Sequence, residues 1–513
     1  MARINEMILI LDFGSQYTQL IARRIREQNV YCEIIPFNAD LNEFSRRNVR
    51  GFVLSGGPES LSEPGSPRLD KSFFATDLPV LGICYGMQLI AEAYGGSLTS
   101  SVTREYGYAD LNVKKSDGIF NNVMDASTVW MSHGDAVKTL PDGFINSGST
   151  TTLEVAAIEN PELKRYGLQF HPEVHHTEEG QKILKNFLFD ICRCAGNWTT
   201  SSFIETTVAG LRENLDGKKV VLALSGGVDS TVCSLLLKQA IGENLYAIFV
   251  NNGVLRKNEF EEVTEMLSSL GLNLIPVDAS KLFLDRLKGV ADPEMKRKII
   301  GNTFIDVFEA EAQKIGEVEF LAQGTLYPDV IESVSFRGPS ATIKSHHNVG
   351  GLKDRMNLKL VEPLRELFKD EVRRLGKKLG LEERFIGRHP FPGPGLAVRI
   401  IGDITEERLR VLREADAIYI QELAKNDQYD KIWQAFAVLL PVKSVGVMGD
   451  ARTYENVVAL RAVTSTDGMT ADWADIPKNI LGRISNRIIN EVKGVNRVVY
   501  DISSKPPATI EWE

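Results

Sequence analysis

Two short segments of this chain carry residue types that could do chemistry, and the first is a glycine-rich turn. It follows an apolar run, 219–224, that predicts a buried strand, and it leads into an apolar run, 231–237, that predicts a helix. Backbone N–H groups at such a turn can hold a phosphate, because glycine allows close approach and a helix N-terminus attracts negative charge. A turn without a ligand is the alternative interpretation. The candidate anion-binding residues are Ser225, Gly226, Gly227, Val228, Asp229, Ser230 and Thr231.

The second segment is centred on Cys84. Gly82-x-Cys84-x-Gly86 is the pattern of a nucleophile elbow, with sulfur in place of the serine oxygen. It follows a predicted strand, 79–83, and it starts a predicted helix, 85–94, whose dipole favours the thiolate. The small flanking residues relieve crowding in the sharp turn. A buried structural cysteine is the alternative interpretation.

A nucleophilic cysteine needs a base, and His171 is the candidate. It follows a predicted strand, 166–170, and Glu173 lies two residues further on. If the segment stays extended, this spacing places both side chains on one face, so Glu173 could orient the imidazole as the acid of a triad does. The tripeptide alone also fits a solvated loop, but together with Cys84 it favours a triad.

The glycine-rich turn resembles the pyrophosphate-binding loop of the N-type ATP pyrophosphatases, which split ATP into AMP and pyrophosphate while they adenylate a substrate. It lacks the Gly-Lys-Ser/Thr ending of a Walker loop. The resemblance implies ATP as a substrate and Mg²⁺ to neutralise the phosphates. Asp229 is the candidate Mg²⁺ ligand, directly or through water. The adjacent pairs His175-His176 and His346-His347 lack acidic or cysteine partners at a ligand spacing, so no transition-metal site is expected.

Residues 7 to about 195 resemble the class I glutamine amidotransferases. The matching segments are 12–16 (Asp-Phe-Gly-Ser-Gln), 54–58 (Leu-Ser-Gly-Gly-Pro), the Cys84 elbow, 132–135 (Ser-His-Gly-Asp) and 171–173 (His-Pro-Glu). The resemblance implies that the cysteine forms a glutamyl thioester from glutamine and releases ammonia. Backbone N–H groups of Gly57 and Tyr85 are expected to hold the oxyanion, and Gln88 is expected to contact the substrate glutamine.

Chain length and segment boundaries predict three domains. The chain has 513 residues, enough for about three domains. A polar stretch at 196–202 and a Pro/Gly cluster at 389–395 mark the boundaries. We therefore expect an α/β domain with a mostly parallel sheet at 7–197, an α/β domain with a parallel sheet at 198–388, and a small α+β domain at 389–513. In the last, helices are predicted at 405–426 and 480–492, and strands at 435–440, 456–463 and 496–502.

Composition excludes several classes of function. The chain is 43% hydrophobic and 25% charged, as in ordinary globular proteins, and its net charge of −9 provides no basic field for nucleic acid or acidic membranes. Five scattered cysteines do not suit a disulfide framework. Because we see neither a signal-peptide pattern nor an apolar run near 18 residues, we expect a cytoplasmic protein without membrane contact.

Three C-terminal segments, 391–399, 445–450 and 504–513, are similar to those of the bacterial glutamine-hydrolysing GMP synthases, and the similarity covers essentially the whole chain. It implies that ATP adenylates XMP, that ammonia displaces AMP to give GMP, and that the last domain forms a homodimer. A loop at 342–352 could close over the nucleotide, with Lys344 as its candidate lid residue. The positions implied to bind XMP are Arg256, Asp329, Lys505 and Glu511.

One position departs from the family pattern, and two alternatives stay open. Asn251 stands where the family often has an acidic residue; we expect activity to survive. Within enzymes, the alternative is another amidotransferase-linked adenylating ligase, of the NAD or asparagine synthetase type, which the segment Lys505–Glu513 disfavours. A nucleotide-binding regulatory protein is the alternative from another class, and the intact Cys84, His171 and Glu173 disfavour it.

Overall fold

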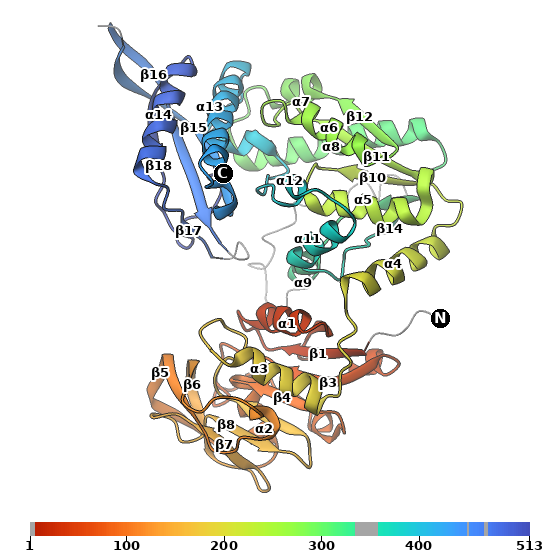
Figure 1. Ribbon diagram of the computed structural model, residues 1–513, viewed down its shortest axis with the longest axis vertical. Helices are drawn as coiled ribbons and strands as arrows, with labels where there is room; N and C mark the ends of the chain where they lie inside the picture. Colours follow the sequence, from red (N-terminus) through yellow and green to blue (C-terminus); the bar gives the residue numbers. More distant parts are fainter. Residues whose placement is uncertain (1–5, 334–357, 449–450, 466–469) are drawn as a thin grey trace. The chain divides into compact units, whose positions relative to one another are not determined.

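The computed structural model describes residues 6–333, 358–448, 451–465 and 470–513, with only the backbone described at 100–104. The chain divides into two compact units (Figure 1). Unit 1 ends at Thr206 and unit 2 starts at Thr207. In the described residues, no helix is long and apolar enough to cross a membrane.

Unit 1 is built on a nine-stranded sheet of order β2-β1-β3-β4-β9-β8-β7-β5-β6. The first five strands in this order pair in parallel, as predicted. The other four pair antiparallel, which the mixed apolar and polar runs after residue 95 did not reveal. The strands are β1 (Glu6–Asp12), β2 (Tyr31–Pro36), β3 (Asn48–Leu54), β4 (Val80–Ile83), β5 (Ser97–Val113), β6 (Ser127–Thr139), β7 (Ile145–Ser149), β8 (Ala157–Asn160) and β9 (Arg165–Leu168).

The helices of unit 1 are short and amphipathic or apolar. The helix α2 is buried almost throughout, because it starts at the elbow and packs on the parallel strands. The helices are α1 (Thr18–Glu27), α2 (Tyr85–Ala93) and α3 (Gly180–Lys185), which continues as a π-helix (Asn186–Ile191), with 3₁₀ turns at Leu41–Phe44, Lys71–Ala75 and Gly118–Phe120.

Unit 2 contains a five-stranded parallel sheet of order β12-β11-β10-β13-β14, which confirms the predicted parallel sheet. Its strands are β10 (Val220–Leu224), β11 (Leu245–Asn251), β12 (Leu274–Asp278), β13 (Phe320–Ala322) and β14 (Lys359–Val361). Its helices are α4 (Thr200–Asn214), α5 (Val228–Ile241), α6 (Glu259–Ser269), α7 (Ser280–Leu287), α8 (Pro293–Ile315), α9 (Tyr327–Ser333), α11 (Lys369–Lys378) and α12 (Glu383–Ile386). Since α4 begins at Thr200, the polar stretch predicted as a linker is partly helical.

The C-terminal part of unit 2 is the predicted small α+β element. A long hairpin of β15 (Gln434–Met448) and β16 (Ala451–Thr464) is extended by the short β17 (Asp472–Trp473) and by β18 (Val495–Tyr500), which pairs with β16 in parallel. The helices are α13 (Glu406–Lys425) and α14 (Lys478–Glu491), with 3₁₀ turns at Gly395–Arg399 and Tyr429–Lys431. Both helices and all three predicted strands are therefore confirmed.

One hydrophobic core runs through both parts of unit 2. It includes Val221 of β10 and Ile248 of β11, and it continues to Leu412 of α13 and Ile484 of α14. The division of this unit at residue 388 stays a prediction. In both units the candidate chemistry lies where parallel strands end: the Cys84 elbow follows β4, and the glycine-rich turn follows β10.

Candidate active sites

Cys84 occupies a strained turn between β4 and α2, as a nucleophile elbow requires. Its backbone has φ 52° and ψ −105°, a conformation that L-residues rarely adopt. Glycine is needed on both sides. A Cβ on Gly82 would lie 2.4 Å from the backbone carbonyl of Gly86, and one on Gly86 would lie 2.4 Å from Leu54 O. The turn is therefore fixed by close backbone contacts that aim one side chain.

The predicted base and acid are in direct contact. His171 Nδ1 lies 2.7 Å from Glu173 Oε1, and both side chains are buried. The segment is a turn after β9, so the condition of an extended segment is not met, but the turn still brings the two side chains together. Burial alone lowers the pKa of His171, but the Glu173 carboxylate and the hydrogen bond with Cys84 outweigh it and raise that pKa well above its usual value. The imidazolium is thus stabilised inside the protein.

The space around the sulfur is formed by glycine and glutamine. A Cβ on Gly56 would lie 3.3 Å from His171 Cε1 and 3.7 Å from Cys84 Cβ, so glycine keeps room beside both residues. The Gln169 amide lies 3.6 Å from the Cys84 sulfur. Sequence reasoning missed Gln169, although its position two residues before His171 was the available signal.

The two residues predicted to hold the oxyanion, Gly57 and Tyr85, are neighbours in the structure. Gly57 follows β3, and a Cβ on it would lie 3.4 Å from Tyr85 Cγ. Tyr85 is the first residue of α2, where a backbone N–H has no acceptor within the helix. Gln88, one turn later, is buried and donates to Asp135 O at 2.8 Å, so its position is fixed from within unit 1. The arrangement suits attack by sulfur on a carboxamide, with donors for the developing charge.

The glycine-rich turn has the expected strand–turn–helix geometry. Gly226 has φ +74°, and Gly227 is the N-cap residue of α5. The Ser230 hydroxyl accepts from Ser225 N at 3.2 Å, and Thr231 Oγ1 donates to Gly227 O at 2.9 Å, which holds the turn in shape. A Cβ on Gly324, which follows β13, would lie 3.2 Å from Ser230 N, so glycine there lets β13 approach the helix start.

Charged side chains from distant parts of unit 2 surround this turn. The pKa of Asp229 is raised above its usual value, and burial is the largest cause. The positive charges of Lys369 and Arg373 lower this pKa, while the negative charge of Asp329 raises it further. Lys369 Nζ lies 4.0 Å from Asp229 Oδ2, while Asp229 Oδ1 is buried and has no hydrogen-bond partner among the described residues. Arg388 donates to Gly226 O at 3.1 Å and pairs with Glu259. Sequence reasoning missed Lys369, Arg373 and Arg388, because tertiary folding alone brings them to the turn.

Two of the predicted XMP residues are linked through one aromatic ring and the arginine beside it. Arg256 pairs with Asp416 at 3.1 Å, and its guanidinium lies 5.2 Å from the Phe391 ring centroid. Arg399 lies 5.2 Å from the same ring and forms a bidentate ion pair with Glu511, at 2.8 and 3.1 Å. Arg256 and Glu511 therefore belong to one cluster.

The other two predicted XMP residues lie elsewhere in unit 2. Asp329 lies at the start of α9, where its carboxylate accepts from Leu326 N at 3.1 Å and raises the pKa of Asp229. Lys505 pairs through its backbone with Ala471. Lys344 lies outside the described residues. Asn251 accepts from Gly253 N at 2.9 Å and so closes the turn after β11.

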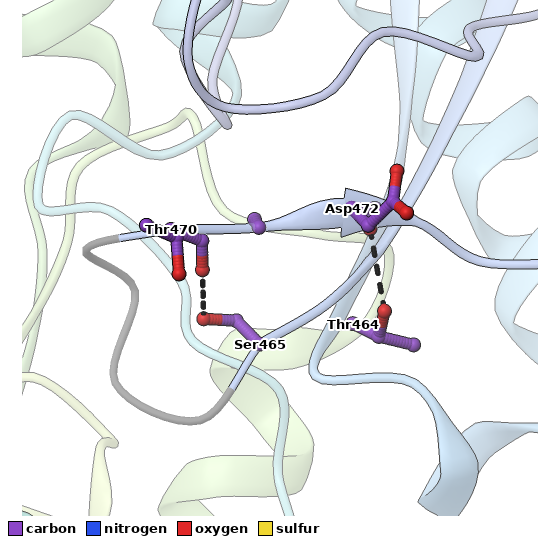
Figure 2. Close-up of a pocket in the computed structure, with 5 residues that line it drawn as sticks. Thr464, Ser465, Thr470 and Asp472 are labelled. Atoms are coloured by element: carbon purple, nitrogen blue, oxygen red, sulfur yellow. Dashed lines mark hydrogen bonds between the residues drawn. The ribbon is translucent and has the colours of Figure 1, made fainter. Parts of the chain in front are cut away.

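A pocket of about 480 Å³ adjoins Lys505 near the end of the β16 strand. Figure 2 shows the Ser465 hydroxyl donating to Thr470 O, and the Thr464 hydroxyl donating to Asp472 O. Both hydroxyls donate to main-chain oxygens, and the Asp472 carboxylate accepts from the Ser504 hydroxyl at 3.0 Å. Its lining residues are Thr464, Ser465, Thr470, Ala471 and Asp472. Among the described residues, no group of three or more His, Cys, Asp or Glu side chains could hold a metal ion.

Comparison with known proteins matches every part of the chain. Three family models match: Glutamine amidotransferase class-I at residues 9–191, NAD synthase at 200–298 and GMP synthase C terminal domain at 421–512. The chain is 59% identical to GMP synthase [glutamine-hydrolyzing] of Brachyspira hyodysenteriae, covering 99% of each chain. It is 58% identical to the protein of that name in Cytophaga hutchinsonii, covering 99% of this chain and 100% of the relative.

Among solved structures, the chain is similar to a putative GMP synthase subunit from Thermoplasma acidophilum. The identity is 35%, the TM-score is 0.34, and the match covers 37% of this chain and 94% of that one.

Proposed function

The chain belongs to the family of glutamine-hydrolysing GMP synthases, and we propose that its two units divide this reaction between them. The overall reaction is the glutamine-dependent conversion of XMP to GMP, with ATP as a substrate. In the proposal, unit 1 releases ammonia from glutamine at Cys84, and unit 2 uses the turn at 225–231 to bind ATP and adenylate XMP. The elbow at Cys84, with its buried His171–Glu173 pair, is the observation that carries the proposal.

In unit 1, the Cys84 sulfur attacks the side-chain carboxamide of glutamine. His171 carries a proton to the departing ammonia, and the buried Glu173 carboxylate stabilises the imidazolium in between. Backbone N–H groups of Gly57 and Tyr85 hold the oxyanion of the tetrahedral intermediate. Water then attacks the thioester, which releases glutamate and restores the thiol.

In unit 2, the backbone N–H groups of the turn and the N-terminus of α5 hold the β- and γ-phosphates of ATP. The oxygen on the purine carbon of XMP attacks the α-phosphate, and pyrophosphate leaves. Ammonia then attacks that carbon and AMP departs, which gives GMP. Lys369 and Arg373 stabilise the phosphate charge, because both lie close enough to Asp229 to lower its pKa.

The residues at this turn fit Mg²⁺ bound together with ATP. Within the part of the chain that the structure describes, Asp229 Oδ1 is buried and has no hydrogen-bond partner, and a carboxylate oxygen is a ligand that Mg²⁺ prefers. Mg²⁺ commonly binds through one or two carboxylates, water and substrate phosphates, so a full protein cage is not required. When bound, it would supply charge neutralisation to the phosphates.

The XMP site is proposed within unit 2, with Arg256 and Asp329 from the part that contains the parallel sheet and Lys505 and Glu511 from the C-terminal part. Arg256 and Lys505 would meet the phosphate of XMP, while Asp329 and Glu511 would accept from ribose hydroxyl or ring N–H groups. The carboxylate of Glu511 has lone pairs beyond those used by Arg399 and Gln434. Lys344 stays the proposed lid residue, Gln88 the proposed glutamine contact, and 7–197, 198–388 and 389–513 the proposed domain limits.

A cytoplasmic homodimer without nucleic-acid partners completes the proposal. The β15–β16 hairpin exposes a face of large apolar side chains, in which Val445 is 47% exposed, Val447 73% and Tyr454 63%. Val445 and Tyr454 are cross-strand partners, so they share this face. Such a patch on a projecting hairpin suits a two-fold contact with a second copy.

Substitution of Cys84 tests whether glutamine hydrolysis and the amination of XMP take place at separate sites. We expect Cys84→Ala to abolish GMP formation from glutamine and to preserve GMP formation from ammonium, XMP and ATP. GMP, AMP and pyrophosphate are measured with each nitrogen donor. A folded variant that fails with ammonium as well would contradict the assignment of the two reactions to separate sites.

A further inference from the structure

Among the described residues of unit 2, three cations are completely buried, and all three contact the same segment. Lys296 lies on α8, Arg399 in the 3₁₀ turn before residue 400, and Arg461 on β16, and each is 0% exposed. Each donates hydrogen bonds to residues 501–513, here called the C-terminal segment. Three charges removed from water at one place indicate a specific role, because burial penalises a charge unless it is fully paired.

Lys296 uses all of its donors. Its ammonium group donates to Ala397 O at 3.1 Å, Ile400 O at 2.7 Å and Glu513 Oε2 at 2.5 Å. An ammonium has three N–H groups, so none is left for a further ligand. The neighbouring Arg297 donates to the main-chain oxygen of Glu513 at 2.7 Å. The end of the C-terminal segment is therefore fixed to α8, on the nucleotide-binding part of the unit.

Arg399 fixes Glu511 in a similar way. The guanidinium binds both carboxylate oxygens and stacks on Phe436, 4.0 Å from the ring centroid. A second donor, the Gln434 amide, reaches the same carboxylate at 2.8 Å. The orientation of Glu511 is thus set by two buried side chains.

Arg461 closes the C-terminal segment into a loop around Lys505. It donates to Ser503 O at 2.6 Å and to Thr509 O at 3.2 Å, and it lies 3.4 Å from the Asp501 carboxylate. Lys505 lies between the two carbonyl acceptors in sequence. One guanidinium therefore holds both ends of the loop that carries Lys505.

Apolar packing alone does not explain why this segment is docked. All of its residues are described, and Ile510 is the apolar side chain that it buries, whereas Ile502 is 65% and Trp512 40% exposed. The segment has one isolated backbone bridge and no helix or ladder strand after Tyr500. The segment is fixed mainly by polar contacts, and the three buried cations contribute hydrogen bonds along its length, from Ser503 to Glu513.

We propose that Lys296, Arg399 and Arg461 are positioning residues of the XMP site. They hold the C-terminal segment so that Lys505 and Glu511 meet XMP in a fixed geometry. This inference rests on the proposed function, in which Lys505 and Glu511 contact XMP. Substitution of any one of these three residues should weaken XMP binding. The glycine-rich turn at 225–231 and the glutaminase site should stay intact.

Lys296→Met tests the proposal, with Lys298→Met as a matched control on the exposed side of the same helix. For Lys296→Met we expect the KM for XMP to rise about tenfold or more, with the KM for ATP and the glutaminase activity within about twofold of wild type. Hydrogen exchange should become faster in residues 501–513 and stay unchanged elsewhere. For Lys298→Met both measurements should match wild type.

Glu513 provides the same test without a change in the core. Glu513→Ala should raise the KM for XMP, and Glu513→Gln should restore part of the affinity, because the amide oxygen can still accept from Lys296. If exchange in the segment is unchanged, or if it rises while the KM for XMP does not, positioning by these cations is refuted. Failure of the wild-type protein to make GMP from XMP would instead refute the proposed function.

Discussion

Gly82→Ala should disconnect glutamine hydrolysis from GMP synthesis without touching any catalytic group. A Cβ at this position would lie 2.4 Å from both the carbonyl carbon and oxygen of Gly86, and 2.5 Å from Met87 N. Contacts below 3.4 Å are already tighter than most real Cβ contacts, so the backbone must move by about 1 Å to reach that distance. The atoms that must move belong to the first turn of α2, directly after Cys84.

A shift of that size is large for a nucleophile. Misplacement of a reacting group by about 1 Å can cost on the order of 100-fold in rate. The overpacking itself costs about 1–3 kcal/mol of stability, which a domain with an ordinary stability of about 5–15 kcal/mol survives. The variant should therefore fold and hydrolyse glutamine about 100-fold more slowly.

The assay compares GMP formation from glutamine with GMP formation from ammonium in the same preparation. The ammonium-driven rate should stay at the wild-type level, because it depends on unit 2. Gly210→Ala on α4 is the control, since a Cβ there meets nothing within 4 Å. A folded Gly82→Ala variant with full glutaminase activity would refute the steric reasoning, as would an equal loss with both nitrogen donors.

Three further predictions concern the base His171, the glycine-rich turn and the β15–β16 hairpin. Glu173→Gln should lower glutaminase activity by about 10²–10⁴-fold. Glu173 raises the pKa of His171 above its unfolded value of about 6.5. The His171–Glu173 pair therefore stabilises the folded protein fully below about pH 6.5, and this stabilisation is lost as the pH rises through the folded-state pKa. Denaturation at a series of pH values should thus show the largest difference between wild type and Glu173→Gln on the acid side; a difference independent of pH contradicts the assignment. Asp229→Ala should lose AMP formation with either nitrogen donor, and pyrophosphate release measures this loss. Retained AMP formation would exclude a role of Asp229 in the adenylation of XMP. If the proposed homodimer forms through the hairpin, Val447→Lys should give a monomer where the wild type sediments as a dimer. A Val447→Lys variant that still sediments as a dimer would exclude this interface.

The residues that could be predicted from sequence are those whose role depends on their neighbours in the chain. The elbow needs glycine two residues before and two residues after Cys84. The glycine-rich turn needs a strand, two glycines and a helix in succession. Both patterns are therefore local in the sequence. The spacing of His171 and Glu173 predicts their contact if the segment is extended, and the structure shows the contact in a turn instead. A separation of two positions along the chain is short enough for either conformation to bring these side chains together.

The residues that could not be predicted are joined to the sites by tertiary structure. Arg388 reaches Gly226 from 162 residues away, and its own surroundings resemble any solvent-exposed basic stretch. Lys369 and Arg373 start a helix of strongly charged composition, in which no residue stands out. The antiparallel half of the unit 1 sheet was missed for a related reason, because pairing direction depends on where distant strands meet.

Asn251 bears on how sequence differences among relatives should be interpreted. Its side-chain oxygen accepts from Gly253 N, and this Asx-turn needs only an oxygen two residues before the N–H. A carboxylate supplies that oxygen as well as an amide does. Exchange between Asn and an acidic residue at this position is therefore expected to be neutral drift, in which the turn is conserved while the charge is not. Substrate affinity should not be inferred from such a difference, and an engineer could vary the charge here without rebuilding the loop.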